Sequence, residues 1–232
     1  MKKLLFTIIA LCCLNLSYGQ KTEIRVSLNS GLFSFAGESA QSVTGINYNE
    51  LTNSGYTNNP YGSRGRLGIG LSGNIKRLST KNRIVGADLG YEWLRSKIKI
   101  NHIYTYPESL DAKGRTYLNA NFLNLFVFMG YRLPVNKINF DFTGGADIAY
   151  CLSSKEDGRA TATDGTKFIT STERKTISFD IRPRIQISAN YNKTGAYIGY
   201  SFGLANYKSD YDGGTNECYA RLLRFGFTWQ IK

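Results

Sequence analysis

The chain has 232 residues, 42% of them hydrophobic, a formal net charge of +12 and four cysteines. This length suffices for one sizeable domain. The basic balance suits nucleic acid or the phosphates of lipopolysaccharide, but no helix clusters Lys and Arg, and the chain carries an export signal, which together exclude nucleic acid.

The N-terminus has the three parts of a secretory signal peptide. Residues 1–3 (MKK) form a short basic region, residues 4–14 (LLFTIIALCCL) are apolar, and residues 17–19 (SYG) place the small Ser17 and Gly19 at the positions that a signal peptidase recognises. We predict cleavage between Gly19 and Gln20, so that residues 1–19 are the signal and residues 20–232 are one domain. The apolar run is too short to span a bilayer as a helix, and a lipoprotein signal at Cys12 or Cys13 is a weaker alternative.

Cleavage removes Lys2 and Lys3, which lowers the charge to about +10, and leaves Cys151 and Cys218. Two cysteines make neither a disulfide framework nor a metal motif. Whether they form a bridge stays open.

Alternating apolar and polar residues recur along the mature chain, and no long helical pattern does. The stretch 179–191 (FDIRPRIQISANY) is typical, with apolar side chains on one face and charged or polar ones on the other. The alternation predicts eight strands, over residues 23–35, 65–77, 83–95, 117–133, 138–152, 175–191, 195–207 and 217–231. Two features break the pattern: Phe126 and Phe128 fall on the polar face, and Pro183 lies inside the sixth strand. Pro183 predicts a bulge or a lost backbone hydrogen bond, with a position beyond the membrane as the alternative.

The connections between these strands alternate strictly between long and short. The long ones cover 36–64, 96–116, 153–174 and 208–216, and the tight turns cover 78–82, 134–137 and 192–194. All long loops therefore lie at one end of the sheet, as in outer-membrane barrels with long extracellular loops and short periplasmic turns.

The decisive question is whether the apolar or the charged face points inward. The strands are longer than is usual in globular proteins and suit a membrane crossing. Aromatic residues also fall near both ends of the apolar faces, as two girdles would require: Tyr91, Trp93, Tyr117, Tyr150 and Tyr219 at the outer end, and Tyr131, Tyr191 and Trp229 at the inner end. We therefore predict an all-β, eight-stranded, antiparallel up-and-down transmembrane β-barrel, with a soluble secreted barrel as the weaker alternative.

A barrel of eight strands has an interior that side chains can fill. The polar face supplies charges of both signs, Arg25 among them. The predicted lumen ion-pair network consists of Arg66, Lys76, Asp88, Glu92, Arg132, Asp141, Asp147, Asp180, Arg182, Arg184 and Arg224.

The segment 117–152 (YLNANFLNLFVFMGYRLPVNKINFDFTGGADIAYCL) resembles the central hairpin of the small outer-membrane β-barrel family often called PorT-like. It has a Tyr-Leu start, an apolar strand closing on Tyr-Arg, a short turn and a Gly-rich returning strand. The ending 221–232 (RLLRFGFTWQIK) is similar to that family's last strand, although the final residue is Lys232 where an aromatic is usual. The resemblance implies a fold and a location, and no catalytic residue.

Four local features suggest chemistry that the context disfavours. Gly68, Gly70 and Gly73 spell a dinucleotide fingerprint but lie inside a strand with no helix following. His102, the single histidine, has no serine at a sequence spacing that would indicate a nucleophile and its base, which acyl chemistry needs. The segment 153–174 has too few acids for calcium, and the Tyr-, Asn- and Gly-rich segment 36–64 suits an adhesive or mobile loop.

We expect a non-enzymatic, porin-like protein of the Gram-negative outer membrane, without cofactor or metal. A side-chain-filled lumen and four long outer loops would serve envelope structure or surface recognition. Expected partners are membrane lipid and lipopolysaccharide, the barrel-assembly machinery, and a protein or glycan ligand at the loops. Alternatives are a narrow channel for small solutes, a lipid-modifying barrel enzyme and an accessory subunit of a secretion or assembly machine.

Overall fold

The computed structural model describes residues 21–174, 176–209 and 216–232, so the predicted signal peptide lies outside the described residues. The strands are β1 (Lys21–Ala36), β2 (Val43–Asn49), β3 (Ser54–Thr57), β4 (Arg64–Leu78), β5 (Arg83–Thr105), β6 (Glu108–Val135), β7 (Ile138–Ala162), β8 (Lys167–Glu173), β9 (Phe179–Tyr191), β10 (Thr194–Phe202) and β11 (Tyr219–Gln230). Within these ranges the structure has no helix with the length and apolarity needed to cross a bilayer.

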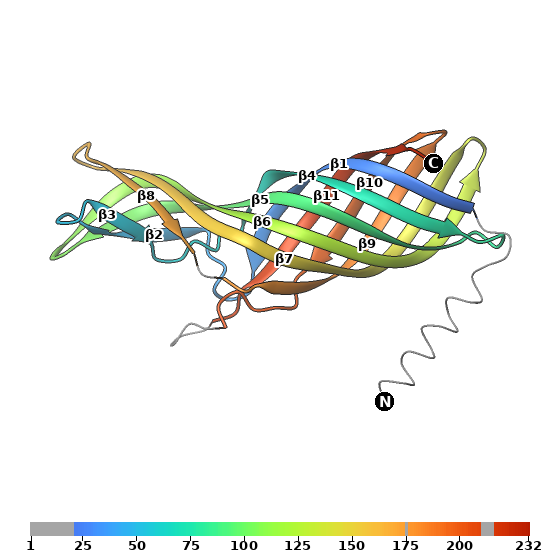
Figure 1. Cartoon of the computed structure of the whole chain (residues 1–232). Helices are drawn as coiled ribbons and strands as arrows, with labels where there is room; N and C mark the ends of the chain where they lie inside the picture. The colour runs from blue at the N-terminus through green and yellow to red at the C-terminus, as the bar shows by residue number, and fades with distance from the viewer. Residues whose placement is uncertain (1–20, 175, 210–215) are drawn as a thin grey trace, which may run out of the picture.

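Eight of the strands close into a ring. The order is β1, β4, β5, β6, β7, β9, β10 and β11, and β11 pairs again with β1, each neighbour being antiparallel (Figure 1). These eight correspond one to one to the predicted strands, which confirms the predicted antiparallel barrel. Full closure leaves the ring without an open edge.

Tight turns join the strands at one end of the barrel, where β1 also begins and the chain ends (Figure 1). Asn82, Asn136 and Asn192 occupy these turns with φ values of 59°, 52° and 50°. Asparagine tolerates this left-handed conformation better than most residues, because its short amide bonds locally to the backbone. We call this the turn end.

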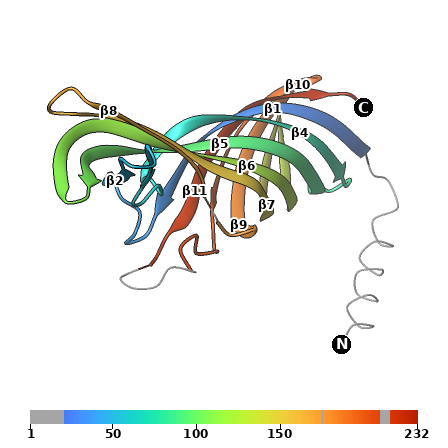
Figure 2. The same ribbon diagram turned by 60° about the vertical axis from the view of Figure 1, so that its left-hand side comes forward.

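At the other end, β5, β6 and β7 continue far beyond the ring. They have 23, 28 and 25 residues, against 9 in β10. We call the resulting projection the arm, and it consists of β2, β3 and β8 with residues 97–105 of β5, 108–116 of β6 and 154–162 of β7 (Figure 1). Figure 2 shows the hairpin of β5 and β6 curling over at the far end of the arm.

The arm corrects the prediction that residues 36–64, 96–116 and 153–174 are loops. Pairing of β5 with β6 continues to Thr105 and Glu108, and β7 pairs with β8 beyond the barrel. The many Lys, Asn, Gly and Tyr residues of these segments are typical of loops and obscure the alternation of a smaller apolar set. That set forms a core inside the arm, built from Ile46, Ile100, Ile103, Ala112, Ala160, Ala162 and Phe168.

The arm curls until its two edge strands meet. The backbone N–H of Thr57 in β3 donates to the Glu156 carboxylate at 2.8 Å, and Arg174 beyond β8 binds both that carboxylate and the Thr57 carbonyl. The Thr172 hydroxyl also donates to the Gly55 carbonyl at 3.3 Å. These bonds satisfy backbone groups that an open sheet edge would expose.

The ring is apolar outside and charged inside. In β9, Ile181 and Ile185 are 52% and 69% exposed, whereas Arg182 and Arg184 between them are buried. Phe227, Met129 and Leu71 show the same outward placement on other strands. This is the arrangement expected when lipid replaces water around a barrel.

Both exceptions to the alternation pattern have a structural reason. Phe126 and Phe128 do face inward, where their rings stack with centres 5.1 Å apart and Phe126 lies beneath the Arg184 guanidinium. Pro183 pairs with Ala146 of β7 without a register shift, and pairing of β9 with β10 ends at Arg184. The missing N–H of Pro183 therefore falls where the β9–β10 ladder has already stopped, and a bulge is not needed.

Candidate functional site

An ion-pair cluster fills the lumen near the turn end. Arg132 donates to Asp141 at 2.6 Å and to both oxygens of Glu23 at 2.7 and 3.0 Å. Lys76 contacts the same two carboxylates at 2.5 and 3.5 Å, and Arg25 reaches Glu23 at 3.4 Å. Each of these side chains is an inward residue of its strand, so the alternation brings opposite charges from β1, β4, β6 and β7 together.

A second cluster centres on Arg224 in the middle of the ring. Its guanidinium donates to Glu92 at 2.7 and 3.0 Å, to Asp147 at 2.6 Å and to the Ser201 hydroxyl at 2.7 Å. Arg224 is 1% exposed, and its partners lie on β5, β7 and β10. A buried guanidinium needs this set of acceptors, because an unpaired charge inside a protein is strongly destabilising.

Arg182 carries the charged layer toward the arm. It binds Asp180 at 2.8 Å and the Tyr207 hydroxyl at 2.9 Å, and its guanidinium lies 4.5 Å from the centre of the Phe122 ring. Arg182 therefore forms an ion pair with Asp180 and a cation–π interaction with Phe122. It also joins the charged layers to the apolar layer above them.

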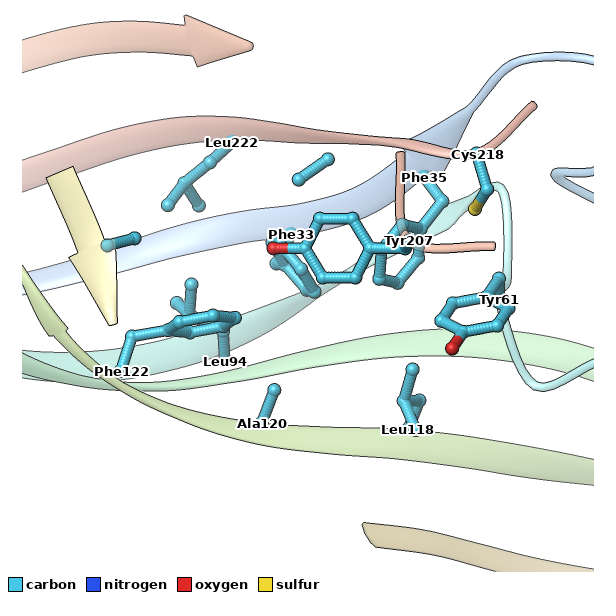
Figure 3. Close-up of a cluster of buried hydrophobic side chains, with 12 residues drawn as sticks. Phe33, Phe35, Tyr61, Leu94, Leu118, Ala120, Phe122, Tyr207, Cys218 and Leu222 are labelled. Carbon is cyan, nitrogen blue, oxygen red and sulfur yellow. The ribbon is translucent and has the colours of Figure 1, made fainter. Parts of the chain in front are cut away.

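An apolar plug closes the lumen at the base of the arm (Figure 3). Phe33, Phe35, Tyr61, Phe122 and Tyr207 pack edge to face, with ring centres 5.0–6.3 Å apart. Tyr61 and Tyr207 come from the connections after β3 and β10 and fold into the barrel mouth. Cys218 lies in the plug and Cys151 packs against it, and both are free thiols.

Little free space remains among the lumen charges. The cavity lined by Lys76, Asp88, Phe128, Asp141 and Tyr197, with other inward residues, has a volume of about 30 Å³. That is room for about one water molecule. The filled interior is consistent with the expected side-chain plug, but the aromatic layer is an addition that the alternation pattern did not reveal.

The structure brings together most of the predicted lumen network. Ten of the predicted residues line the interior: Lys76, Asp88, Glu92, Arg132, Asp141, Asp147, Asp180, Arg182, Arg184 and Arg224. Asp88 accepts a hydrogen bond from Ser72, and Arg184 donates to Gln186. Sequence reasoning missed Glu23, because it stands at the first residue of its predicted strand, where a face is hardest to assign.

The predicted inward position of Arg66 is wrong. A register shift between Arg66 and Ile69 sets two residues of β4 against one of β5, and this bulge moves Arg66 to the outer face. There its guanidinium lies 5.9 Å from the Tyr117 ring centre. Alternation alone cannot locate such a bulge, because it assigns successive residues to opposite faces without exception.

The predicted girdle residues all lie on the outer face. Tyr131, Tyr191 and Trp229 sit next to the turn end, and each is about half exposed. Tyr91, Trp93 and Tyr150 lie toward the arm, and Tyr219 pairs with Ala36 at the end of the β1–β11 ladder. Tyr117 lies further out, because it pairs with Lys97, four residues beyond Trp93.

A tyrosine-rich groove occupies the end of the arm. Tyr48, Tyr56, Tyr104, Tyr106 and Arg174 line an open volume of about 930 Å³ together with Asn, Thr and Ser side chains. Tyr48 donates to Asn53 at 2.6 Å and packs edge to face on Phe168 of the arm core. The Tyr56 ring lies under the Arg174 guanidinium at 5.5 Å, so two of the rings are held in place.

Other candidate motifs find structural explanations. His102 contacts Asp111 through Nδ1 at 3.0 Å on the arm surface, and within the described ranges no serine hydroxyl bonds to it. A side chain at Gly68 or Gly70 would collide with β5, so these glycines let β4 pass closely across bulky inward residues. Glu156 and Asp157 point to opposite faces of β7, and the described residues contain no cluster of three metal-ligating side chains.

A closed ring with lipid-facing apolar residues and an ionic interior defines an integral membrane β-barrel. Residues 39–209 match the family described as outer membrane protein beta-barrel domain, which is well over half of the chain. The chain therefore belongs to this family, and its place is the outer membrane.

Two solved structures are also similar. Neisserial surface protein A (NspA) has 10% identity and a TM-score of 0.33, with 91% of this chain and 98% of that chain covered. The translocator domain of autotransporter NalP from Neisseria meningitidis has 11% identity and a TM-score of 0.30, covering 98% and 95%. Likenesses this weak carry no argument about the present chain. No curated protein has a significantly similar sequence.

Proposed function

We propose that this barrel is a non-enzymatic outer-membrane protein that presents its arm at the cell surface to recognise a protein or a glycan. The observation that carries the proposal is the tyrosine-rich groove on an arm with its own apolar core. A packed arm holds a binding surface in one shape, which lowers the entropy lost when a ligand binds.

The orientation follows from the connections. Outer-membrane barrels have short periplasmic turns and long extracellular segments. The turn end would accordingly face the periplasm, after export by the predicted signal peptide and folding by the barrel-assembly machinery. The arm would then extend outward from the membrane.

The groove has the composition of a recognition surface. Tyrosine offers a large contact area with few rotatable bonds, and Asn, Ser and Gly add adaptable hydrogen bonding. Tyr106 and Tyr104 are 101% and 43% exposed, so their rings are available to a ligand. A tyrosine ring has an apolar face and a polar hydroxyl, so it suits both a protein surface and a sugar, and both ligand classes stay within the proposal.

The lumen has a structural role in this proposal. The cavity found between the buried ion pairs has a volume of only about 30 Å³, which supports a closed lumen. Planar-bilayer recordings of the purified chain are expected to show no steady conductance. Reproducible single-channel openings would favour the narrow channel instead.

Binding by the purified full chain tests the recognition role. A glycan array and a panel of extracellular proteins would be probed with wild type and with the Tyr104→Ser, Tyr106→Ser double variant, which is expected to lose at least tenfold in affinity. Leu51→Ser is the control, because Leu51 is 98% exposed between the groove residues Asn49 and Thr52 in sequence but does not itself line the groove. Equal binding by all three proteins would contradict the proposed site.

A further inference from the structure

The outer surface where the barrel meets the arm carries a dense band of basic side chains. We call it the cationic band, and it consists of Arg64, Arg66, Arg95, Lys97, Lys99, Lys113, Arg115, Arg159 and Lys167. Lys97, Lys99, Lys113, Arg115, Arg159 and Lys167 line one open groove of about 840 Å³. The band thus gathers charge from five strands on one face.

The register places like charges directly opposite one another. Lys99 pairs with Arg115, and Arg115 pairs with Arg159, so three cations form one row across β5, β6 and β7. Arg64 likewise pairs with Lys97, and Arg66 with Arg95. Like charges at directly opposed positions destabilise a sheet. The cationic band therefore carries an electrostatic cost within the sheet.

Counter-charges from the protein are scarce. None of the cationic-band residues forms an ion pair with any residue of the described ranges. Asp157 is the acid closest in register, and its carboxylate accepts hydrogen bonds from Asn119 at 2.7 Å and Ser171 at 3.3 Å. Three guanidiniums, those of Arg66, Arg95 and Arg115, instead surround the Tyr117 ring at 4.6–5.9 Å.

The band begins where the lipid-facing surface ends. Along β5 the outward residues are Val85, Ala87, Leu89, Tyr91 and Trp93, followed at once by Arg95, Lys97 and Lys99. Two residues of strand span about 7 Å, so Arg95 lies at the headgroup level that the Trp93 ring marks. Lys99 lies about 20 Å along the strand from Trp93, or about 14 Å along the membrane normal at a tilt near 45°.

We infer that the cationic band binds the phosphates of lipopolysaccharide molecules packed around the barrel. A multiply phosphorylated saccharide headgroup supplies anions over the depth that the band covers, and guanidinium groups bind phosphate in a bidentate manner. The bound phosphates would remove the repulsion within the row of Lys99, Arg115 and Arg159. The inference rests on the outward orientation proposed above but not on the tyrosine-rich groove.

The test uses the full chain refolded in detergent and fluorescent lipopolysaccharide. The variant Lys99→Ser, Arg115→Ser, Arg159→Ser removes the central row, and the control Arg77→Ser, Arg83→Ser, Lys193→Ser removes equal charge from exposed sites at the turn end. The first variant is expected to bind on the order of 100-fold more weakly and the control within about twofold of wild type. Unchanged binding by the first variant, or equal losses in both, would overturn the inference.

Two further arms identify the ligand chemistry. Dephosphorylated lipopolysaccharide is expected to bind as weakly as the triple variant does, and wild-type binding should fall steeply between 50 and 500 mM salt, in a range where screening lengths shrink to a few ångströms. Inorganic pyrophosphate that bound as tightly as the lipid would show a soluble-phosphate site and overturn the lipid assignment. If the triple variant does not fold, the single variant Arg115→Ser is measured, with a loss of roughly fivefold expected.

Because detergent micelles impose no orientation, this experiment is independent of which end faces outward. If the groove variant binds like wild type while the triple variant loses lipopolysaccharide binding, only the recognition role is contradicted. If the groove variant loses binding while the triple variant binds lipopolysaccharide like wild type, only the lipid site is contradicted.

Discussion

The barrel and the arm are built from the same strands with opposite polarity. In the barrel segment of β5, Tyr91 and Trp93 point outward and Glu92 points inward, whereas in the arm Lys97 and Lys99 point outward and Ile98 inward. The change occurs between Trp93 and Arg95 without a break in pairing to β6. Along one continuous strand, the outward side chains therefore change from apolar and aromatic to basic where the surroundings change from lipid to water.

The interior changes at the same level. Charged clusters occupy the lumen up to Arg182, the apolar plug follows, and the arm core lies beyond it. Within the membrane the outer face is apolar to suit lipid, so the polar and charged residues lie inside the barrel. Beyond the membrane the outer face meets water, and the usual arrangement with an apolar core applies. The comparison predicts that equivalent substitutions have different consequences in the two regions.

The largest effect is expected from Arg224→Met in the barrel. It leaves Glu92 and Asp147 buried without their cation, which costs about 3–5 kcal/mol of unfolding free energy. Urea unfolding in phospholipid vesicles measures the change. Adding Glu92→Gln and Asp147→Asn removes the unpaired charges, and it should recover most of the loss. If the single variant lost less than about 1 kcal/mol, the buried ion pairs would not be what holds the interior together.

Phe168→Ala should affect the arm and spare the barrel. Phe168 is 4% exposed in the arm core, and its truncation is expected to cost about 3 kcal/mol, confined to local opening of the arm. Limited proteolysis should become faster at arm sites while the urea midpoint of the barrel stays the same. Ile169→Ala is the control, since its neighbouring side chain is 61% exposed. A lower barrel midpoint in the Phe168 variant would show that the two regions unfold as one unit.

These regions also differ in how far the sequence predicts them. The strands of the ring, the outward apolar face and ten lumen residues follow from period-two alternation, because the lipid environment demands it along every strand. The arm does not follow, since its apolar residues are few and lie among Lys, Asn and Gly typical of loops. Loop residues such as Tyr207 reach the plug through tertiary contacts that no local pattern contains, and the bulge at Arg66 reverses a face without a sequence signal.

Glu156→Gln tests how the arm closes. The Glu156 carboxylate joins β3 to Arg174, and neutralising it is expected to cost about 1–3 kcal/mol of local stability. Hydrogen exchange measured by mass spectrometry should speed up at the β3 amides and remain unchanged in β9. Asp157→Asn is the matched control, because that carboxylate lies on the outer face of the same strand. Faster exchange in the control alone would place the closing contact elsewhere.

The smallest effect is expected from Arg66→Ser. Its side chain lies outside the ring and contributes only an exposed cation–π contact with Tyr117, so unfolding free energy should change by less than about 0.5 kcal/mol. Lys76→Ser, ten residues along the same strand, is the comparison, because it leaves Glu23 and Asp141 with one cation fewer inside the lumen and should destabilise several times more. The two residues are alike in sequence pattern and differ in structure by a single bulge. Equal losses in urea unfolding would mean that β4 keeps its alternation past Ile69 and that Arg66 points inward after all.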